Sequence, residues 1–303
     1  MPGLAPMYAR ERARHEHARL VLERVLAGCS ESGIDVLPVK GILTARLFYR
    51  DPGERPIRDV DLRVRDRDLP LVERAGQRGG WRLLSRSWAY RTLAFDVLGF
   101  LVEFESHVGP PGLCALRVDD MLRRARAATD PLGLPHLQPE LHDHAVLLCV
   151  NAFKDKLIDA VPGAIRDLEI LPMQAGFDPG RFVRLAVESQ VATIAWIVAD
   201  WLVEARCSTA WREIREDLGR VVPRRRYARL FSRAVRSRRP PRQALRLLAR
   251  AGSDRLSGQV AALCVMAVEP IAATIAGRHP ANVPPVRRTQ QEGTALGGNR
   301  MCS

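Results

Sequence analysis

Residues 59–64 of the chain read Asp-Val-Asp-Leu-Arg-Val, so charged and apolar side chains alternate along them. This period of two predicts a β-strand with one face in a hydrophobic core and one polar face. Asp59 and Asp61 then project from the same face, roughly 6–7 Å apart, where their charges repel each other. A divalent cation bound by both carboxylates would remove the repulsion, so this strand predicts a metal site on a half-buried sheet.

A second acidic strand is predicted in residues 101–108, Leu-Val-Glu-Phe-Glu-Ser-His-Val. Glu103, Glu105 and His107 alternate with other side chains and face one way, although an edge strand with one solvated face would give the same pattern. Either glutamate could supply a third carboxylate beside the two aspartates. Carboxylates from neighbouring strands can hold a pair of Mg²⁺ ions about 3.5–4 Å apart, the arrangement that serves phosphoryl and nucleotidyl transfer.

A Lys-Gly pair, Lys40-Gly41, stands where a short apolar strand turns into a predicted helix. A glycine that opens a helix lets a phosphate approach backbone N–H groups, and the ammonium beside it can bind a β- or γ-phosphate. The chain contains 44 Arg but only 3 Lys, so a lysine at this turn indicates a need for a compact ammonium. Arg55 and Arg58, in the loop before the aspartates, could reach the same anion or pair with the aspartates.

The sequence pattern changes near residue 135. Strands and helices mix before this point, and a succession of helices separated by Pro and Gly follows it. We therefore expect an α+β protein, a small mixed β-sheet with flanking helices followed by an α-helical domain. The expected domains are residues 1–135, including an N-terminal helix, and residues 136–277. Residues 278–303 lack periodicity and are expected to be a disordered tail.

The sequence also bears on the location of the protein. The N-terminal residues are charged and lack the apolar core of a secretion signal. The longest apolar run, residues 191–203, is short and carries Asp200, which fits a buried helix rather than a membrane span. The six cysteines lie far apart without a Cys-x-x-Cys pair, so reduced thiols are expected and no zinc or redox motif is indicated. We therefore expect a cytoplasmic protein without a membrane partner.

Three of these segments resemble the motifs of a known family. They are Lys40-Gly41, the segment Arg-Pro-Ile-Arg-Asp-Val-Asp-Leu at 55–62, and Phe-Glu-Ser-His at 104–107. The combination resembles the uncharacterised nucleotidyltransferase family within the DNA polymerase β superfamily, over residues 34 to about 202. The resemblance implies a small mixed sheet flanked by helices, a helical C-terminal domain, and metal-dependent transfer of a nucleotidyl group.

The resemblance also assigns roles to particular residues. It implies that Glu105, rather than Glu103, is the third metal ligand, with His107 as the family's accompanying histidine. The superfamily more often has Gly-Ser at the nucleotide turn, whereas Ile42 follows Gly41 here. No serine hydroxyl is then available to hold a phosphate, so Lys40 is expected to carry more of the triphosphate contact.

The helical part resembles the family at two places. Arg166-Asp167-Leu168 is similar to a later aspartate motif, and we expect Asp167 to cap or pair within the helical domain. The helix at 140–156 is similar to the family's histidine-bearing helix, with Asn151 where a histidine is usual.

Other side chains of this helix have two interpretations. His142 and His144 flank Asp143 at a spacing that points the imidazoles apart, so we expect a solvated surface rather than a metal site. Lys154 and Lys156 could reach a triphosphate and close a cleft, or could belong to a solvated face.

Residues 221–250 hold eleven arginines. Together with the net charge of +13, they are compatible with RNA as a partner. Aromatic residues are few in this region and no RNA-binding motif is present, so we favour solvated helix faces in an arginine-rich chain.

The sequence therefore predicts a nucleotidyltransferase that uses two Mg²⁺ ions and an NTP. The acceptor, a hydroxyl group of a protein, an RNA or a small molecule, stays open. The alternative is an inactive module of the same fold that binds nucleotide or RNA. The expected site residues are catalytic and metal-binding Asp59, Asp61 and Glu105, and nucleotide-binding Lys40, Gly41, Arg55 and Lys154.

Overall fold

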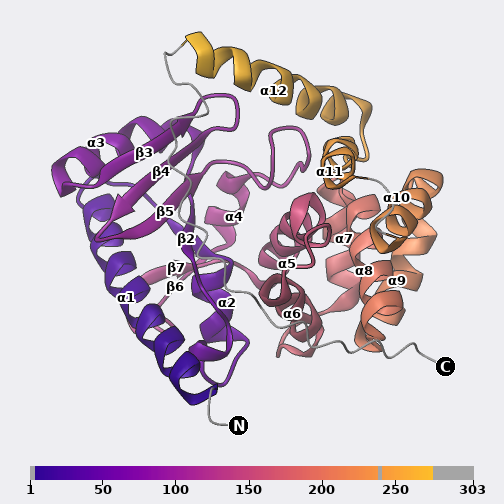
Figure 1. Cartoon of the computed structure of the whole chain (residues 1–303), viewed down its shortest axis with the longest axis horizontal. Helices are drawn as coiled ribbons and strands as arrows, with labels where there is room; N and C mark the ends of the chain where they lie inside the picture. Colours follow the sequence, from indigo (N-terminus) through magenta and orange to yellow (C-terminus); the bar gives the residue numbers. More distant parts are fainter. Residues whose placement is uncertain (1–3, 238–240, 276–303) are drawn as a thin grey trace.

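A computed structural model describes residues 4–237 and 241–275 of the chain (Figure 1). Strands and helices mix up to about residue 140, and the described residues after that point form helices. The expected α+β class is therefore confirmed. The tail expected at residues 278–303 lies outside the described residues.

Five strands form one mixed sheet in the order β1-β2-β5-β4-β3. The two central strands, β2 and β5, are parallel, and all the other pairs of this sheet are antiparallel. A second, two-stranded sheet pairs β6 with β7 across the domain boundary expected at residue 135. The strands are β1 (Leu37–Val39), β2 (Asp59–Arg63), β3 (Arg82–Ser87), β4 (Thr92–Val97), β5 (Phe100–Glu105), β6 (Arg126–Ala128) and β7 (His136–Gln138).

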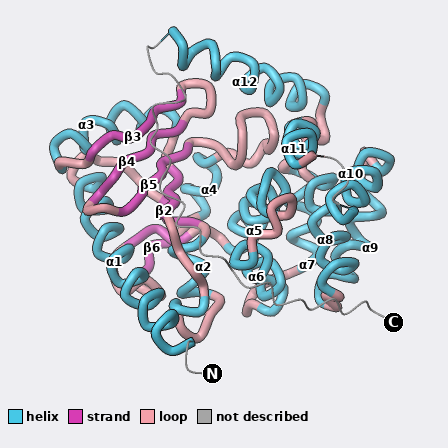
Figure 2. Tube along the Cα trace, in the orientation of Figure 1, coloured by secondary structure: helices cyan, strands magenta, loops and turns pink. Residues whose placement is uncertain are grey.

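Helices α1 (Leu4–Ser30) and α3 (Leu69–Gly79) pack on the apolar face of the main sheet (Figures 1 and 2). On the sheet side of this contact, Val60 and Leu62 of β2 are fully buried. The polar residues of β2 consequently face away from α1 and α3. The stripe that α1 buries has helical spacing: Ala18, Val21, Leu22, Val25 and Cys29.

Residues 141–275, which we call the helical half, follow the sheet half (residues 4–105). Helices α2 (Gly41–Leu47) and α4 (Val118–Arg124) lie between the sheet and α5 in Figure 1. The helical half contains α5 (Leu141–Asn151), α6 (Pro162–Ile170), α7 (Pro179–Glu188), α8 (Ala192–Arg206), α9 (Ala210–Val221), α10 (Arg225–Ser237), α11 (Arg242–Arg250) and α12 (Leu256–Ile275).

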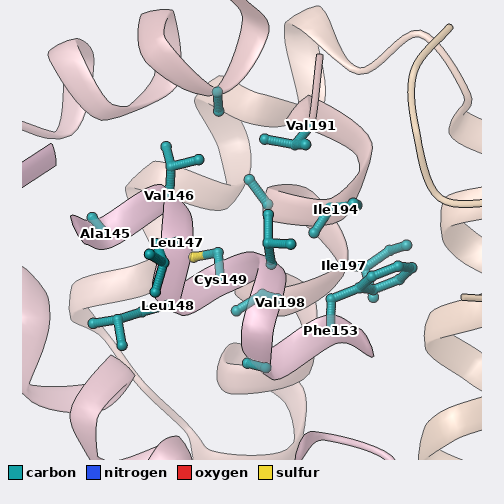
Figure 3. Close-up of a cluster of buried hydrophobic side chains, with 14 of the residues drawn as sticks. Ala145, Val146, Leu147, Leu148, Cys149, Phe153, Val191, Ile194, Ile197 and Val198 are labelled. Atoms are coloured by element: carbon teal, nitrogen blue, oxygen red, sulfur yellow. The ribbon is translucent and has the colours of Figure 1, made fainter. Parts of the chain in front are cut away.

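Helix α5 forms the centre of the helical half. All residues from 142 to 150 are buried, so the helix has no solvated face along this stretch. Figure 3 shows Val146 and Cys149 of α5 beside Ile194 and Val198 of α8 in one hydrophobic cluster. This burial fixes α5 against both the other helices and the sheet half, because Leu37 and Val39 of β1 belong to the same cluster.

Two further expectations concern the environment of the protein. None of the helices within residues 4–237 and 241–275 combines the length and the apolar character needed to cross a membrane. Cys29, Cys114, Cys149 and Cys264 are free thiols, as expected.

Candidate active site

Four carboxylates share the polar face of the two central strands. β2 carries Asp59 and Asp61, and β5 carries Glu103 and Glu105. In the parallel register Asp61 lies opposite Glu103, so these two side chains project together from the sheet. Asp61 is buried and the other three are half-buried. The alternation along the two strands thus brings the predicted acidic residues to one surface.

Three of the carboxylates are close enough to share a cation. Asp61, Glu103 and Glu105 each offer an oxygen within 4.8 Å of the others. Asp59 lies outside this group of three but lines the same cleft. Carboxylate oxygens are the donors that Mg²⁺ prefers, whereas softer metals favour His and Cys. The residues at this face therefore fit Mg²⁺.

Two of the carboxylates are costly to ionise where they lie. Burial, together with the charge of Asp61, raises the pKa of Asp59 to about 6. The same causes raise the pKa of Glu103 to about 7. A cation near these side chains would stabilise their ionised forms, because opposite charge offsets both the desolvation and the repulsion.

Glu105 already has two cationic partners. Arg63 Nη2 contacts Glu105 Oε2, and Lys40 Nζ lies 3.6 Å from Glu105 Oε1. Burial alone would raise the pKa of Glu105, but the charges of Arg63 and Lys40 lower it well below its usual value. No motif assigns Arg63 to a site, although this residue continues the alternation of Asp59 and Asp61 along β2.

Lys40 is held by its side chain and by its backbone. Its Nζ donates to Asp61 Oδ1 at 2.5 Å. Its φ is +54°, in a region that residues with a side chain rarely adopt, and it precedes the first residue of α2. The Lys40 N–H donates to Nε2 of His144 at 3.0 Å. Burial and the charge of Arg63 lower the pKa of His144 to about 3, so this imidazole stays neutral and can accept the bond.

The expectation that His142 and His144 are solvated is wrong, because both side chains are buried. The reason is that α5 is covered on all sides over this stretch, so residues pointing in opposite directions are both inside the protein. His142 Nδ1 lies 2.8 Å from Glu140 Oε1, and Asp143 accepts two hydrogen bonds from Arg124. The imidazoles have structural partners in place of water.

Arg55 binds a buried carboxylate of the helical half. Its Nε and Nη2 donate to the oxygens of Asp167 at distances of 2.9–3.1 Å. Asp167 also accepts from the hydroxyl groups of Tyr49 and Thr44. The expectation that Asp167 pairs within the helical domain is therefore wrong: it joins α6 to α2 and to the loop before β2. The phosphate contact expected for Arg55 stays a prediction.

Two lysines approach the carboxylates from the helical half. After α5 the chain makes a π-helical turn, η3 (Ala152–Lys156), a geometry that is frequent at functional sites. The charge of Lys154 favours the ionised form of Glu105, and the charge of Lys156 favours that of Asp59. Both ammonium groups therefore act electrostatically on the sheet.

A cleft of about 1170 Å³ lies between the two halves. The four carboxylates, Lys40 and Gly41 line it from the sheet half, and Lys154 and Lys156 line it from the helical half. Pockets for one small ligand usually have volumes of about 300–1,000 Å³, so this cleft has room for more than one reactant.

Some residues of the cleft could not be assigned to it from the sequence, and the histidine that accompanies the acidic strand in the family motif does not line it. Tyr49, Trp201 and Arg206 line the cleft although no motif assigns them to a site, and Arg166 lines it from the segment that resembles the family's later aspartate motif. His107 is not among the lining residues, and its Nδ1 lies 3.0 Å from the hydroxyl oxygen of Ser106.

The family model of uncharacterised nucleotidyltransferases matches residues 3–204, a range that includes every carboxylate and lysine of the cleft. Curated proteins give no significant match. Among solved structures, the solution structure of the antibiotic-resistance factor ANT(2'')-Ia is similar to 57% of this chain and 91% of that chain, with 15% sequence identity and a TM-score of 0.40.

Proposed function

Since the chain belongs to the family of uncharacterised nucleotidyltransferases, we propose that it transfers a nucleotidyl group from an NTP to a hydroxyl acceptor, with Mg²⁺ as cofactor. The observation that carries this proposal is the polar face of β2 and β5, where four carboxylates meet lysines from both halves in one cleft. Such a site combines ligands for Mg²⁺ with cations for a triphosphate.

We propose that Asp59, Asp61 and Glu103 hold two Mg²⁺ ions. Glu103 lies opposite Asp61, and its ionised form gains most from a cation because its pKa is raised to about 7. Glu105, the ligand that the family resemblance favours, is engaged by Arg63 and Lys40. Bound Mg²⁺ would lower the pKa of the acceptor hydroxyl and neutralise charge on the transferred phosphate.

The basic residues of the cleft would bind the triphosphate. Lys40 and Lys154 line the cleft from its two sides, and the charge of each favours the ionised form of Glu105, which lies beside the proposed metal ligands. Arg58 is exposed and lines the cleft, so it can reach an anion more easily than Arg55, which is bound to Asp167. The acceptor would enter the remaining volume between the two halves.

The metal assignment is tested with a double variant, Asp59→Asn with Asp61→Asn. Isothermal calorimetry of NTP in the presence of Mg²⁺ should show lost or strongly weakened binding. Each Asp→Asn substitution keeps the size of the side chain but removes a negatively charged ligand. Asp217→Asn is the matched control, since Asp217 pairs with Arg220 on the surface of α9, outside the cleft. Undiminished Mg²⁺-dependent binding in the double variant would refute the assignment.

The transfer reaction is tested by incubating the protein with each labelled NTP, Mg²⁺ and host extract. Mass spectrometry of the labelled product then identifies the acceptor and the nucleotide added. The proposal predicts a product that depends on Mg²⁺ and is absent with the double aspartate variant.

The alternative function is an inactive module that binds nucleotide or RNA. The observation that favours RNA is on α10, where Arg226, Arg229 and Arg233 are exposed and form no ion pair with a described residue. Their spacing places them along one side of the helix. RNA affinity that falls steeply with salt, weakens in Arg229→Gln and is unchanged in the double aspartate variant would support this alternative.

A further inference from the structure

The ammonium of Lys40 contacts Asp61, one of the carboxylates that would bind Mg²⁺. Its Nζ is 2.5 Å from Asp61 Oδ1 and 3.6 Å from Glu105 Oε1. These two carboxylates, with Glu103, are the ones whose oxygens lie within 4.8 Å of one another. Asp61 Oδ1 and Glu105 Oε1 thus already have a cationic partner from the chain itself, the ammonium of Lys40.

The position of this ammonium is built into the fold. Lys40 is 8% exposed, and its strained backbone, with φ at +54°, is held by the hydrogen bond to His144. Arg63 binds the other oxygen of Glu105, which keeps that carboxylate turned toward Lys40. Strain of this kind persists only where the surroundings enforce it, and it occurs most often at functional sites.

Two cations cannot share one carboxylate oxygen at contact distance without strong repulsion. Mg²⁺ on Asp61 would therefore displace Nζ of Lys40. The lysine stem is flexible and its charge is compact, so the ammonium can move to a phosphate oxygen that arrives with the metal.

We propose that Lys40 is an exchangeable counter-ion: it neutralises Asp61 in the nucleotide-free protein and transfers its contact to the triphosphate when Mg²⁺ and NTP bind. This inference rests on the proposed function. Metal and nucleotide then bind with positive coupling. Mg²⁺ releases the Lys40 ammonium to contact the triphosphate, and the triphosphate takes up the ammonium that Mg²⁺ must displace from Asp61. Metal alone binds weakly, since no phosphate is present to receive the displaced ammonium.

The first test is the affinity for Mn²⁺ without nucleotide, measured by calorimetry. Lys40→Met keeps the length of the side chain and removes its charge, so metal affinity should rise about tenfold or more. Lys154→Met is the matched control for the general loss of one positive charge in the cleft, and its effect should be clearly smaller. An equal or smaller effect in Lys40→Met would overturn the proposal.

The second test needs no change at Lys40. Because the chain has only three lysines, selective ¹³C labelling of lysine gives three side-chain signals in an NMR spectrum. Lys154→Met and Lys156→Met assign the other two. The Lys40 signal should shift little with Mg²⁺ alone and strongly with Mg²⁺ plus a non-hydrolysable NTP analogue. A full shift with Mg²⁺ alone, or none with both, would contradict the exchange.

The outcomes separate this inference from the proposed function. If wild-type protein binds Mg²⁺ and NTP but Lys40→Met does not tighten Mn²⁺ binding, the exchange is refuted and the nucleotidyltransferase proposal stands. If neither metal nor NTP binds to the wild-type protein, the proposed function fails and the exchange fails with it.

Discussion

The contact between Arg55 and Asp167 makes a strong prediction about stability. Asp167 is 1% exposed and accepts hydrogen bonds from Arg55, Tyr49 and Thr44. Removing one member of a buried, well-bonded ion pair typically costs about 3–5 kcal/mol, because the other charge remains buried without its partner. Asp167→Asn keeps the size of the side chain and removes the charge, so it should lower the free energy of unfolding by an amount in this range.

Urea unfolding followed by tryptophan fluorescence and by circular dichroism measures this cost. Asp217→Asn is the control, because Asp217 and Arg220 form an exposed pair, for which the expected loss is about 0–1 kcal/mol. In a double-mutant cycle, Asp167→Asn and Arg55→Met together should cost much less than the sum of the single changes. A loss for Asp167→Asn no larger than that of the control would refute the buried pair as a source of stability.

Three further predictions concern residues of the cleft. The raised pKa values of Asp59, about 6, and of Glu103, about 7, mean that the folded state holds protons that the unfolded state releases above about pH 4. Without metal, the contribution of these two carboxyl groups to stability is therefore present below about pH 4 and lost as pH rises through 6 and 7. Mg²⁺ affinity should rise over the same interval. Calorimetry in buffers of different ionisation enthalpy should detect the protons that the two groups release when Mg²⁺ binds. Gly41→Ala should keep the melting temperature but weaken Mg²⁺-dependent NTP binding, since its Cβ has no neighbour closer than 3.7 Å and lines the cleft. Gly163→Ala should lower the melting temperature, because its Cβ would lie 2.8 Å from Nη1 of Arg55.

The strand that carries the aspartates could be predicted because its information is local. Val60 and Leu62 enter the core, so Asp59 and Asp61 must leave it on the other side, and no distant residue alters that alternation. Which glutamate of β5 lies beside the aspartates cannot be predicted from local sequence. Both glutamates of β5 face the same side, and only the parallel register, with Asp61 opposite Glu103, separates them.

The errors in the helical half have a common physical cause. An amphipathic pattern distinguishes an inner from an outer face only when a helix has one side in water. Helix α5 is covered on every side, so the directions of His142 and His144 carried no information about exposure. The sequence places Asp167 in the helical domain, whereas its partner Arg55 lies 112 residues earlier in the chain. Such a pair is set by tertiary packing and leaves no periodic signal.

The two halves supply opposite charges to one cleft, and this makes the contacts between them relevant to chemistry. The sheet half brings the carboxylates, and the helical half brings the two lysines of η3. Two buried contacts set the distance between these groups: His144 with the N–H of Lys40, and Asp167 with Arg55. On the sheet side, these contacts are made by Lys40, directly before α2, and by Arg55, in the loop before β2. Both residues line the same cleft as the carboxylates. Loosening Asp167 should therefore weaken nucleotide binding as well as stability, whereas a cavity in the core of either half should lower stability alone.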